Sequence, residues 1–357
     1  MLEITELFQL TAQNKASDLH LVVGDPPILR VDGELKKISR FPVLNKDEIE
    51  RIILALLTAE QKEVFLANKE LDFSYQWQEL RFRVNIYHQR GTMAGSFRLI
   101  PEKIGTIEEL NLPAVCYQLV NLRQGLILIT GPSGMGKSTT LAAIINEINQ
   151  QRSVHIVTIE DPIEYIYPSG KAIVSQREVR FDTYSWEVAL RSALREDPDV
   201  LLIGEMRDYE TIASALTIAE TGHLVFATLH TNSAAQTVDR VVDVFPAHQQ
   251  PQIRLQLSFT LEAVLSQRLL PQIAGGRVPG FEILLGSAAV RNCIREGKTQ
   301  LIDNIIQTSQ EKGMMSLETY LADLVKRGKV TYQTAQSFAL RPEELARLLK
   351  DKKIKSS

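Results

Sequence analysis

The stretch GLILITGPSGMGKSTT, residues 125–140, decides the fold of this chain. Its first six residues form an apolar run of strand length, and the residues from Lys137 onward have the apolar spacing of a helix. Between them, Gly131–Ser138 matches the pattern GxxxxGK[ST] in full. The glycines let backbone N–H groups turn inward around phosphate oxygens without a Cβ clash. Strand, glycine-rich loop and helix in this order predict a nucleotide-binding α/β domain.

This loop, the Walker A motif, has the residues needed to hold both phosphate and metal. Lys137 can reach the β- and γ-phosphates, and the Ser138 hydroxyl can ligate Mg²⁺. The helix that starts near Lys137 adds the positive end of its dipole to the anion site. A guanine-reading NKxD motif is not found downstream; the nearest stretch, Asn45–Glu48, lies upstream and ends in Glu. We therefore predict ATP with Mg²⁺ as the ligand, with Ser138 holding the metal from this loop. The predicted nucleotide-binding residues are Gly131, Pro132, Ser133, Gly134, Met135, Gly136, Lys137, Ser138 and Thr139.

Residues 113–286 alternate apolar runs with helical patterns. This alternation predicts a mostly parallel sheet covered by helices. From Ser287 onward the pattern is helical only, and the basic tail is interpreted as a solvated end of the chain. The expected strands are Gly125–Thr130, Val154–Ile159, Val200–Ile203 and Leu224–Thr228, with helices over Lys137–Ile148, Ser185–Arg195 and Tyr209–Glu220 between them.

Residues 1–100 have a different pattern, which predicts a smaller α+β domain. Short apolar runs at 19–23 and 28–31 flank a Gly-Asp-Pro-Pro turn, and residues 47–66 have the spacing of an amphipathic helix. Three consecutive antiparallel strands are expected over 71–77, 80–87 and 93–100. Residues 101–112, which begin at a proline and end just before another, are the predicted linker to the larger domain.

Two acidic motifs follow strands of the larger domain. VLLIGE, residues 200–205, has the Walker B form, in which Glu205 could hold the Mg²⁺ shell through water. The alternative for Glu205 is a carboxylate that caps the strand or pairs with Arg207. TIEDPIE, residues 158–164, places three carboxylates in one loop stiffened by Pro162, which favours general-base catalysis over the alternative of an ordinary Asp-Pro turn. The spacing does not choose between Glu160 and Glu164.

Two histidines and three arginines are further candidates for the site. His223 and His230 bracket the strand GHLVFATLHT and fall on opposite faces, so we do not expect them to share a metal. His230 lies at the carboxyl end of the strand, where ligands of α/β sheets collect, and could contact the γ-phosphate; a structural role fits either histidine equally well. Arg81, Arg83 and Arg98 could offer a planar fork to the phosphates, with surface ion pairs as the alternative.

Composition narrows the classes of function. The 357 residues include 40 Lys plus Arg and 43 Asp plus Glu, and a net charge of −3 disfavours nucleic acid as a partner. Cys116 and Cys293 are far apart and form no CxxC pair, as is typical of a reducing cytoplasm. The N-terminus lacks the basic region of a signal peptide, and no apolar run approaches the ~20 residues that cross a bilayer. We expect a cytoplasmic protein without direct membrane insertion.

Seven blocks of sequence resemble one family, the secretion ATPase superfamily (GspE/PilT family) of type IV pili and type II secretion. Within it the chain is most similar to the pilus retraction ATPases. Met135 replaces a residue that is usually small in the family; its side chain can point outward, because only the backbone contacts phosphate, and we expect no loss of activity. The blocks, in the family's order, are ASDLHL (16–21), RFRVN (81–85), GPSGMGKSTT (131–140), TIEDPIE (158–164), LREDPDVLLIGEMRD (194–208), TGHLVFATLHTNSA (221–234) and IREGKTQ (294–300).

The resemblance implies a PAS-like N-terminal domain over residues 1–100, a RecA-like ATPase domain over 113–286 and a helical region over 287–357. It also implies a homohexameric motor that hydrolyses ATP to power pilus retraction and twitching motility through nucleotide-driven domain closure. Its partner would be an inner-membrane pilus platform protein, which would hold it at the cytoplasmic face of that membrane. The implied roles are general base for Glu164, Walker B acid for Glu205, His box for His223 and His230, and phosphate contacts for Arg83 and Arg98.

Several other functions are weighed against this one. A pilus-extension or type II secretion ATPase has the same fold, but those enzymes typically add N-terminal domains and a four-cysteine zinc insertion, and this chain shows neither. A nucleic-acid translocase is disfavoured by the charge balance. A paralogue without hydrolysis is disfavoured because Lys137, Glu164 and Glu205 are all present. A module that only binds nucleotide would show no turnover, and loss of turnover in Glu164→Gln with ATP binding kept would exclude it.

Overall fold

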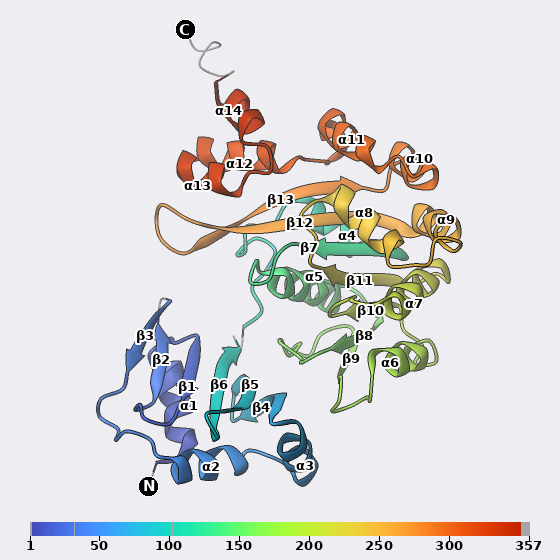
Figure 1. The fold of residues 1–357 in the computed structure, drawn as a ribbon. Coiled ribbons are helices and arrows are strands. Elements are labelled where there is room, and N and C mark those ends of the chain that lie inside the picture. Colours follow the sequence, from blue (N-terminus) through green and yellow to red (C-terminus); the bar gives the residue numbers. More distant parts are fainter. Residues whose placement is uncertain (1, 32, 101–102, 351–357) are drawn as a thin grey trace. The chain divides into compact units, whose positions relative to one another are not determined.

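The computed structural model describes residues 2–31, 33–100 and 103–350. The chain forms two compact units, Met1–Lys103 with Pro162–Ile166, and Ile104–Asp161 with Tyr167–Ser357. Each unit has its own sheet and its own hydrophobic core (Figure 1). The first two residues of the predicted linker, 101–102, and the last seven of the basic tail lie outside the described residues.

The first unit is an antiparallel sheet with helices on one face. Its described elements are α1 (Ile4–Gln13), β1 (Asp18–Leu21), β2 (Ile28–Val31), β3 (Glu34–Lys37), α2 (Lys46–Leu54), α3 (Ala59–Asn68), β4 (Glu70–Trp77), β5 (Leu80–Gln89) and β6 (Thr92–Ile100). The strands lie in the order β3-β2-β1-β6-β5-β4, and each neighbouring pair is antiparallel. Phe82, Val84 and Ile86 of β5 are buried with the helices, so Arg81 and Arg83, which alternate with them, share the opposite face.

The prediction of a single helix over residues 47–66 is wrong. The structure has two helices there, because the backbone leaves the helix after Leu54 and Thr58 begins a new one. The Thr58 hydroxyl accepts the backbone N–H of Gln61, and the Gln61 side chain accepts the backbone N–H of Thr58. This reciprocal pair satisfies donors that a continuous helix would have bonded internally, and it fixes the break.

The second unit is a mixed sheet between two layers of helices. Its described elements are α4 (Val115–Val120), β7 (Gly125–Thr130), α5 (Lys137–Gln151), β8 (His155–Glu160), β9 (Ile173–Glu178), α6 (Trp186–Ala193), β10 (Val200–Ile203), α7 (Tyr209–Glu220), β11 (Leu224–Leu229), α8 (Ala234–Asp243), α9 (Gln250–Thr260), β12 (Leu261–Pro271), β13 (Arg277–Leu285), α10 (Ala288–Glu296), the short 3₁₀ turns Thr299–Leu301 and Gln310–Lys312, α11 (Ile302–Thr308), α12 (Leu317–Lys326), α13 (Tyr332–Phe338) and α14 (Pro342–Lys350).

The strand order of this sheet is β13-β12-β7-β11-β10-β8-β9. All neighbouring pairs are parallel except β12 with β13. Alternate residues of β7 enter different cores: Leu126 and Leu128 pack toward α7 and α8, whereas Ile127 and Ile129 pack toward α4 and α5. Burial on both faces explains why these strands read as unbroken apolar runs, and the predicted mostly parallel α/β sheet is confirmed.

The β12–β13 hairpin forms one edge of this sheet, and the sequence patterns did not predict it. Its two strands are paired from Ala263 with Leu285 to Pro271 with Arg277. Leu270 and Val278 from the hairpin join a separate cluster with α12, α13 and α14, which lie beyond this edge of the sheet in Figure 1. Across the described residues, no helix is both long enough and apolar enough to span a bilayer.

Candidate active site

The glycine-rich loop runs from the end of β7 to the start of α5 and has the backbone of an anion site. Gly131, Gly134 and Gly136 all have positive φ, at 141°, 77° and 81°. A Cβ on Gly131 would lie 2.4 Å from the carbonyl oxygen of Gln267, so that position has no room for a side chain. Gly136 is the N-cap of α5 and, as a glycine, makes no side-chain capping hydrogen bond to the first turn. The N–H groups of this turn are therefore directed toward a loop that suits a phosphate.

Lys137, the first residue of α5, is buried, with 8% of its surface exposed. Its ammonium donates to the carbonyl oxygens of Gly131 at 2.7 Å and Pro132 at 3.1 Å, and it lies 3.4 Å from Nδ1 of His230. Neutral carbonyls orient this cation without cancelling its charge. A buried ammonium held in this way provides a site for phosphate oxygens.

Glu205, two residues beyond β10, contacts two basic side chains. Its Oε1 lies 2.8 Å from Nε2 of His230, and its Oε2 accepts a hydrogen bond of 2.8 Å from Nη2 of Arg207. Burial favours the neutral acid, but the Arg207 hydrogen bond and the charges of His230, Arg207 and Lys137 outweigh it and lower the pKa of Glu205. The carboxylate is therefore ionised at neutral pH. The pairing with Arg207 that the sequence left as an alternative is present alongside the contact with His230.

The structure brings Lys137, His230 and Glu205 together because β7, β11 and β10 are adjacent parallel strands. Parallel strands end at one edge of the sheet, and each of these three is followed by a loop that supplies one of the residues. His230 connects the other two, since Nδ1 faces Lys137 and Nε2 faces Glu205. Figure 1 shows β7, β11 and β10 side by side in this order.

The predicted magnesium ligands, Ser138 and Glu205, fit a Mg²⁺ ion that is also held by phosphate and water. Ser138 is the second residue of α5, and Glu205 provides an ionised carboxylate. The described part of the chain contains no cluster of three or more His, Cys, Asp or Glu that could hold a metal ion by itself. Mg²⁺ commonly takes one or two protein oxygens and completes its shell with water and substrate phosphates, so this donor set is adequate.

The three carboxylates of TIEDPIE have different surroundings, although the sequence grouped them in one loop. Glu160 is buried and accepts hydrogen bonds from Thr158 at 2.7 Å and from Gln176 at 3.2 Å. Asp161 lies 3.8 Å from Arg180, also in the second unit. Glu164 belongs instead to the first unit.

Glu164 and two of the candidate arginines form one group on the first unit. Glu164 Oε1 lies 3.7 Å from Nη1 of Arg83. Arg83 and Arg98 are directly opposite each other on β5 and β6, and Arg98 Nε donates to Asp18 at 2.9 Å. Arg81 donates to the carbonyl of Ile163, next to Glu164, at 3.4 Å. The two arginines share one cross-strand position, where their like charges would repel, and each has a nearby carboxylate that offsets its charge.

His223 lies away from this group of residues. It precedes β11, and its Nδ1 is 3.0 Å from the carbonyl of Ile218 and 3.1 Å from the hydroxyl of Thr221. His223 and His230 are therefore at opposite ends of one strand. The partners of His223 belong to the C-terminal end of α7, which is a structural environment.

Sequence reasoning missed Gln267, which contacts the glycine-rich loop. Its Nε2 donates to the carbonyl of Met135, and its Oε1 accepts from the hydroxyl of Thr140, both at 2.8 Å. The Met135 side chain reaches β12, where its sulfur accepts the backbone N–H of Leu269 at 3.4 Å. The sequence signal for this contact between Gln267 and the glycine-rich loop is a Gln-Arg pair inside the largely apolar run AVLSQRLL of β12.

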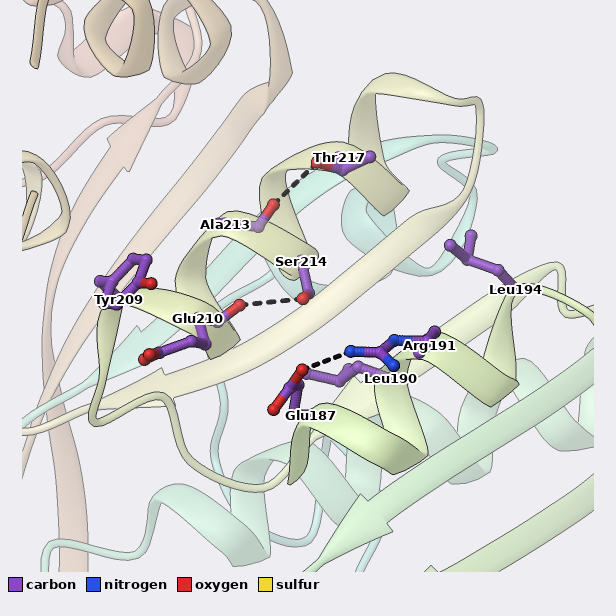
Figure 2. Close-up of a pocket in the computed structure, with 9 residues that line it drawn as sticks. All are labelled: Glu187, Leu190, Arg191, Leu194, Tyr209, Glu210, Ala213, Ser214 and Thr217. Carbon is purple, nitrogen blue, oxygen red and sulfur yellow. Dashed lines mark hydrogen bonds and ion pairs between the residues drawn. The ribbon is translucent and has the colours of Figure 1, made fainter. Parts of the chain in front are cut away.

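A hollow of about 360 Å³ between α6 and α7 is separate from these groups (Figure 2). None of its lining residues is a predicted site residue. Its polar groups are largely bonded within their own helices: Glu187 pairs with Arg191, and Ser214 and Thr217 donate to backbone carbonyls one turn earlier. The hollow therefore lacks the convergent polar groups of a catalytic site.

Comparison with known proteins agrees with the geometry of the strand ends. The family model described as type II/IV secretion system protein matches residues 3–277. The chain belongs to this family. Among family members, it is 48% identical over 343 residues to the type IV pilus retraction ATPase PilT of Pseudomonas aeruginosa, covering 96% of this chain and 99% of that protein.

Two further comparisons within the secretion family cover most of the chain. A twitching motility protein of Neisseria gonorrhoeae is 45% identical over 322 residues, covering 90% of this chain and 86% of that protein. A crystal structure of the pilus retraction motor PilT with bound ADP matches with a TM-score of 0.91 at 45% identity, covering 97% of this chain and all of that one. The family resemblance and the α/β fold class predicted from the sequence are confirmed.

Proposed function

We propose that this chain is a subunit of an ATP-hydrolysing motor that powers type IV pilus retraction. The observation behind the proposal is the contact of Lys137 and Glu205 through His230 at the ends of adjacent parallel strands. Such a group can bind a nucleoside triphosphate and polarise its terminal phosphate. The near full-length similarity to PilT supports retraction as the work that hydrolysis drives.

In the proposed site, ATP lies on the glycine-rich loop with Mg²⁺ bound to its phosphates. Backbone N–H groups of the loop, from Ser133 to Ser138, would face the phosphates, and Lys137 would neutralise part of their charge. Ser138 and Glu205 would hold Mg²⁺, which supplies charge neutralisation on the phosphate oxygens. His230 fixes the Glu205 carboxylate by a contact of 2.8 Å and faces the lysine from the other side.

We assign Glu164, rather than Glu160, as the general base. Glu160 is buried and already accepts hydrogen bonds from Thr158 and Gln176, so it is poorly placed to take a proton from water. Glu164 keeps about a third of its side chain exposed (35%) beside Arg83. Arg83 and Arg98 would contact the nucleotide phosphates, because a guanidinium binds phosphate oxygens in the same planar, forked geometry that it uses with carboxylates.

The assembly proposed for this motor is a homohexamer that works by nucleotide-driven domain closure. Its domains would be a PAS-like domain over residues 1–100, a linker over 101–112, a RecA-like domain over 113–286 and a helical region over 287–357. We propose an inner-membrane pilus platform protein as its partner and the cytoplasmic face of that membrane as its location. No nucleic acid is involved, consistent with the net charge of −3.

The biochemical test measures ATP turnover and nucleotide affinity on the purified full chain. Glu164→Gln is expected to abolish turnover and to leave ATP binding intact, whereas Lys137→Ala is expected to lose binding. Glu63→Gln, an exposed carboxylate on α3, is the matched control and should behave like the wild type. Full turnover in the Glu164 variant would refute its role as the base. Turnover stimulated by DNA at low salt would favour a translocase instead.

The cellular test is deletion of the gene, scored by twitching and by counting surface pili. Loss of a retraction motor predicts abundant pili that no longer move. Bald cells would show that the chain extends pili, and would refute retraction. Light scattering of the purified chain with ATP should give the mass of six subunits, and a stable monomer under all nucleotide conditions would contradict the ring.

A further inference from the structure

Strand β12 has three buried polar residues in a row, Ser266–Arg268, and the two with long side chains are Gln267 and Arg268, with 2% and 7% of their surfaces exposed. Their side chains leave opposite faces of the sheet. Leu265, on the face of Gln267, packs in the core that includes α5, whereas Val264, on the face of Arg268, packs in the core that includes α8. Buried polar groups are costly unless they are hydrogen-bonded, so the partners of this pair determine its role.

Gln267 holds the glycine-rich loop at two points. Its amide donates to the carbonyl of Met135 within the loop and accepts from the hydroxyl of Thr140 on the first turns of α5. Its own backbone carbonyl lies against Gly131 at the start of the loop. A glutamine supplies the donor and the acceptor that these two contacts need, which neither glutamate nor leucine can do.

Arg268 holds the loop that follows His230. One guanidinium nitrogen donates to the carbonyl of Asn232 at 2.8 Å and lies 3.3 Å from its Oδ1, and the other donates to the carbonyl of Gln267 at 3.0 Å. Asn232 is two residues beyond His230, so Arg268 fixes the backbone from which His230 extends. The Gln267 carbonyl is therefore shared: it accepts from Arg268 and contacts Gly131.

We propose that Gln267 and Arg268 are positioning residues that set the glycine-rich loop and the His230 loop in register with each other. The distance of 3.4 Å between Lys137 and His230 depends on both loops, and these two side chains fasten both loops to one strand. Gln267 shapes the phosphate-binding loop, and Arg268 places the histidine that contacts Glu205. This inference rests on the proposed function of the site, because it concerns the same nucleotide.

The test for Gln267 measures ADP binding to the full chain by isothermal titration calorimetry. Gln267→Leu is expected to weaken ADP binding about tenfold and Thr140→Val about threefold, because they remove two hydrogen bonds and one. Thr140→Ser keeps the hydroxyl and should bind like the wild type. Gln272→Leu is the matched control, since Gln272 donates to a carbonyl within the hairpin turn and not to the glycine-rich loop.

The test for Arg268 separates kcat from binding. Arg268→Met is expected to lower kcat for ATP about tenfold with ADP affinity unchanged within twofold, since His230 moves while the glycine-rich loop stays in place. Arg268→Lys keeps the charge and should recover part of the loss. If Arg268→Met weakens binding and turnover equally, Arg268 supports the fold in general and its positioning role is refuted.

The outcomes for the inference and for the proposed function are distinguishable. A wild-type chain that binds no ADP refutes the proposed function and the inference with it. A wild-type chain that binds ADP, together with a folded Gln267→Leu variant that binds as well as Gln272→Leu, refutes the inference alone. Should Gln267→Leu melt below the assay temperature, Thr140→Val decides: weaker binding supports the brace, and unchanged binding refutes it.

Discussion

Glu282 on β13 is a buried carboxyl whose protonation should make the stability of the second unit depend on pH. It is 1% exposed, and its Oε1 accepts the backbone N–H of Ala234 at 2.6 Å. Among the described residues, its Oε2 has no hydrogen-bond partner. The pKa of Glu282 is raised from 4.5 to about 7, mainly by burial. The negative charges of Asp303 and Glu318 also raise it, whereas the hydrogen bond from the Ala234 N–H and the positive charge of Arg341 lower it. The charge of Glu282 in turn opposes the lowering of the Arg268 pKa by burial.

The sign and size of the effect follow from this raised pKa. Between pH 4.5 and about 7 the folded chain keeps the Glu282 proton and the unfolded chain has lost it, so stability falls as pH rises through this range. Above pH 7 both states are ionised and the loss is complete. At 1.36 kcal/mol per pKa unit, the loss is about 3 kcal/mol. Glu282→Gln removes it, and its amide oxygen can still accept from Ala234.

The assay is urea denaturation at pH 5 and pH 8, followed by the fluorescence of Trp186. The chain has two tryptophans, and Trp186 packs against the core of the second unit, so a Trp77→Phe background isolates its signal. Glu282→Gln should be more stable than its parent at pH 8 by about 3 kcal/mol and close to it at pH 5. The exposed Glu311→Gln variant is the control. The same difference at both pH values would refute the buried, protonated carboxyl.

Two further predictions concern the cores. Phe8→Ala should lower the free energy of unfolding of the first unit by about 3–5 kcal/mol, because Phe8 is fully buried, stacks on Phe82 with ring centroids 4.1 Å apart and packs edge-on to Phe97 at 5.6 Å. Urea denaturation followed by Trp77 fluorescence measures this change, and a decrease below about 1 kcal/mol would contradict the packing. Cys116 is fully buried, and burial raises its pKa to about 12. In a Cys293→Ser background, the folded chain should therefore not react with Ellman's reagent at pH 8, and the thiol should react once guanidinium unfolds the chain. Rapid labelling of the folded chain would contradict the burial of Cys116.

Local signals in the sequence were sufficient to predict the bounds of the central elements of the second unit. β7, β10 and α7 begin and end at the residues expected from their patterns. The two strands are buried on both faces and are therefore apolar at nearly every position, and α7 begins after Asp208, whose side chain caps it. The edge strand β9 was missed, since most of its residues are only partly buried and give no clear period. The break between α2 and α3 was missed because the apolar spacing continues across it, and the capping pair at Thr58 is a weaker signal than that spacing.

The sequence placed several site residues on the correct loops, but it did not give their partners. It put Lys137, Glu205 and His230 at strand ends, and parallel topology then brings them together. It grouped Glu160 with Glu164, whereas the structure separates them because Glu160 turns into its own sheet to bond Thr158 and Gln176. Such pairings are decided by strand order and packing, which a motif read along one stretch of chain does not contain.

Gln267 shows most clearly why part of the site was beyond sequence reasoning. Its partners, Met135 and Thr140, lie 132 and 127 residues away, and no local pattern distinguishes a glutamine that braces a loop from one that faces water. The only local sign is that polar residues interrupt an apolar run. Such an interruption in a buried strand has to be matched by hydrogen bonds elsewhere, so it indicates a tertiary contact without naming the partner.

The β12–β13 hairpin joins the nucleotide site to the C-terminal helices through both of its strands. On β12, Gln267 contacts the glycine-rich loop, and three residues later Leu270 packs in the cluster of α12, α13 and α14. On β13, Glu282 bonds the first residue of α8, and the charges around it come from α11, α12 and Arg341. A shift of the C-terminal helices would therefore be resisted by contacts that also hold the loops of the site. The helices from α10 to α14 are therefore mechanically connected to the proposed site, although none of the residues assigned to that site lies in them.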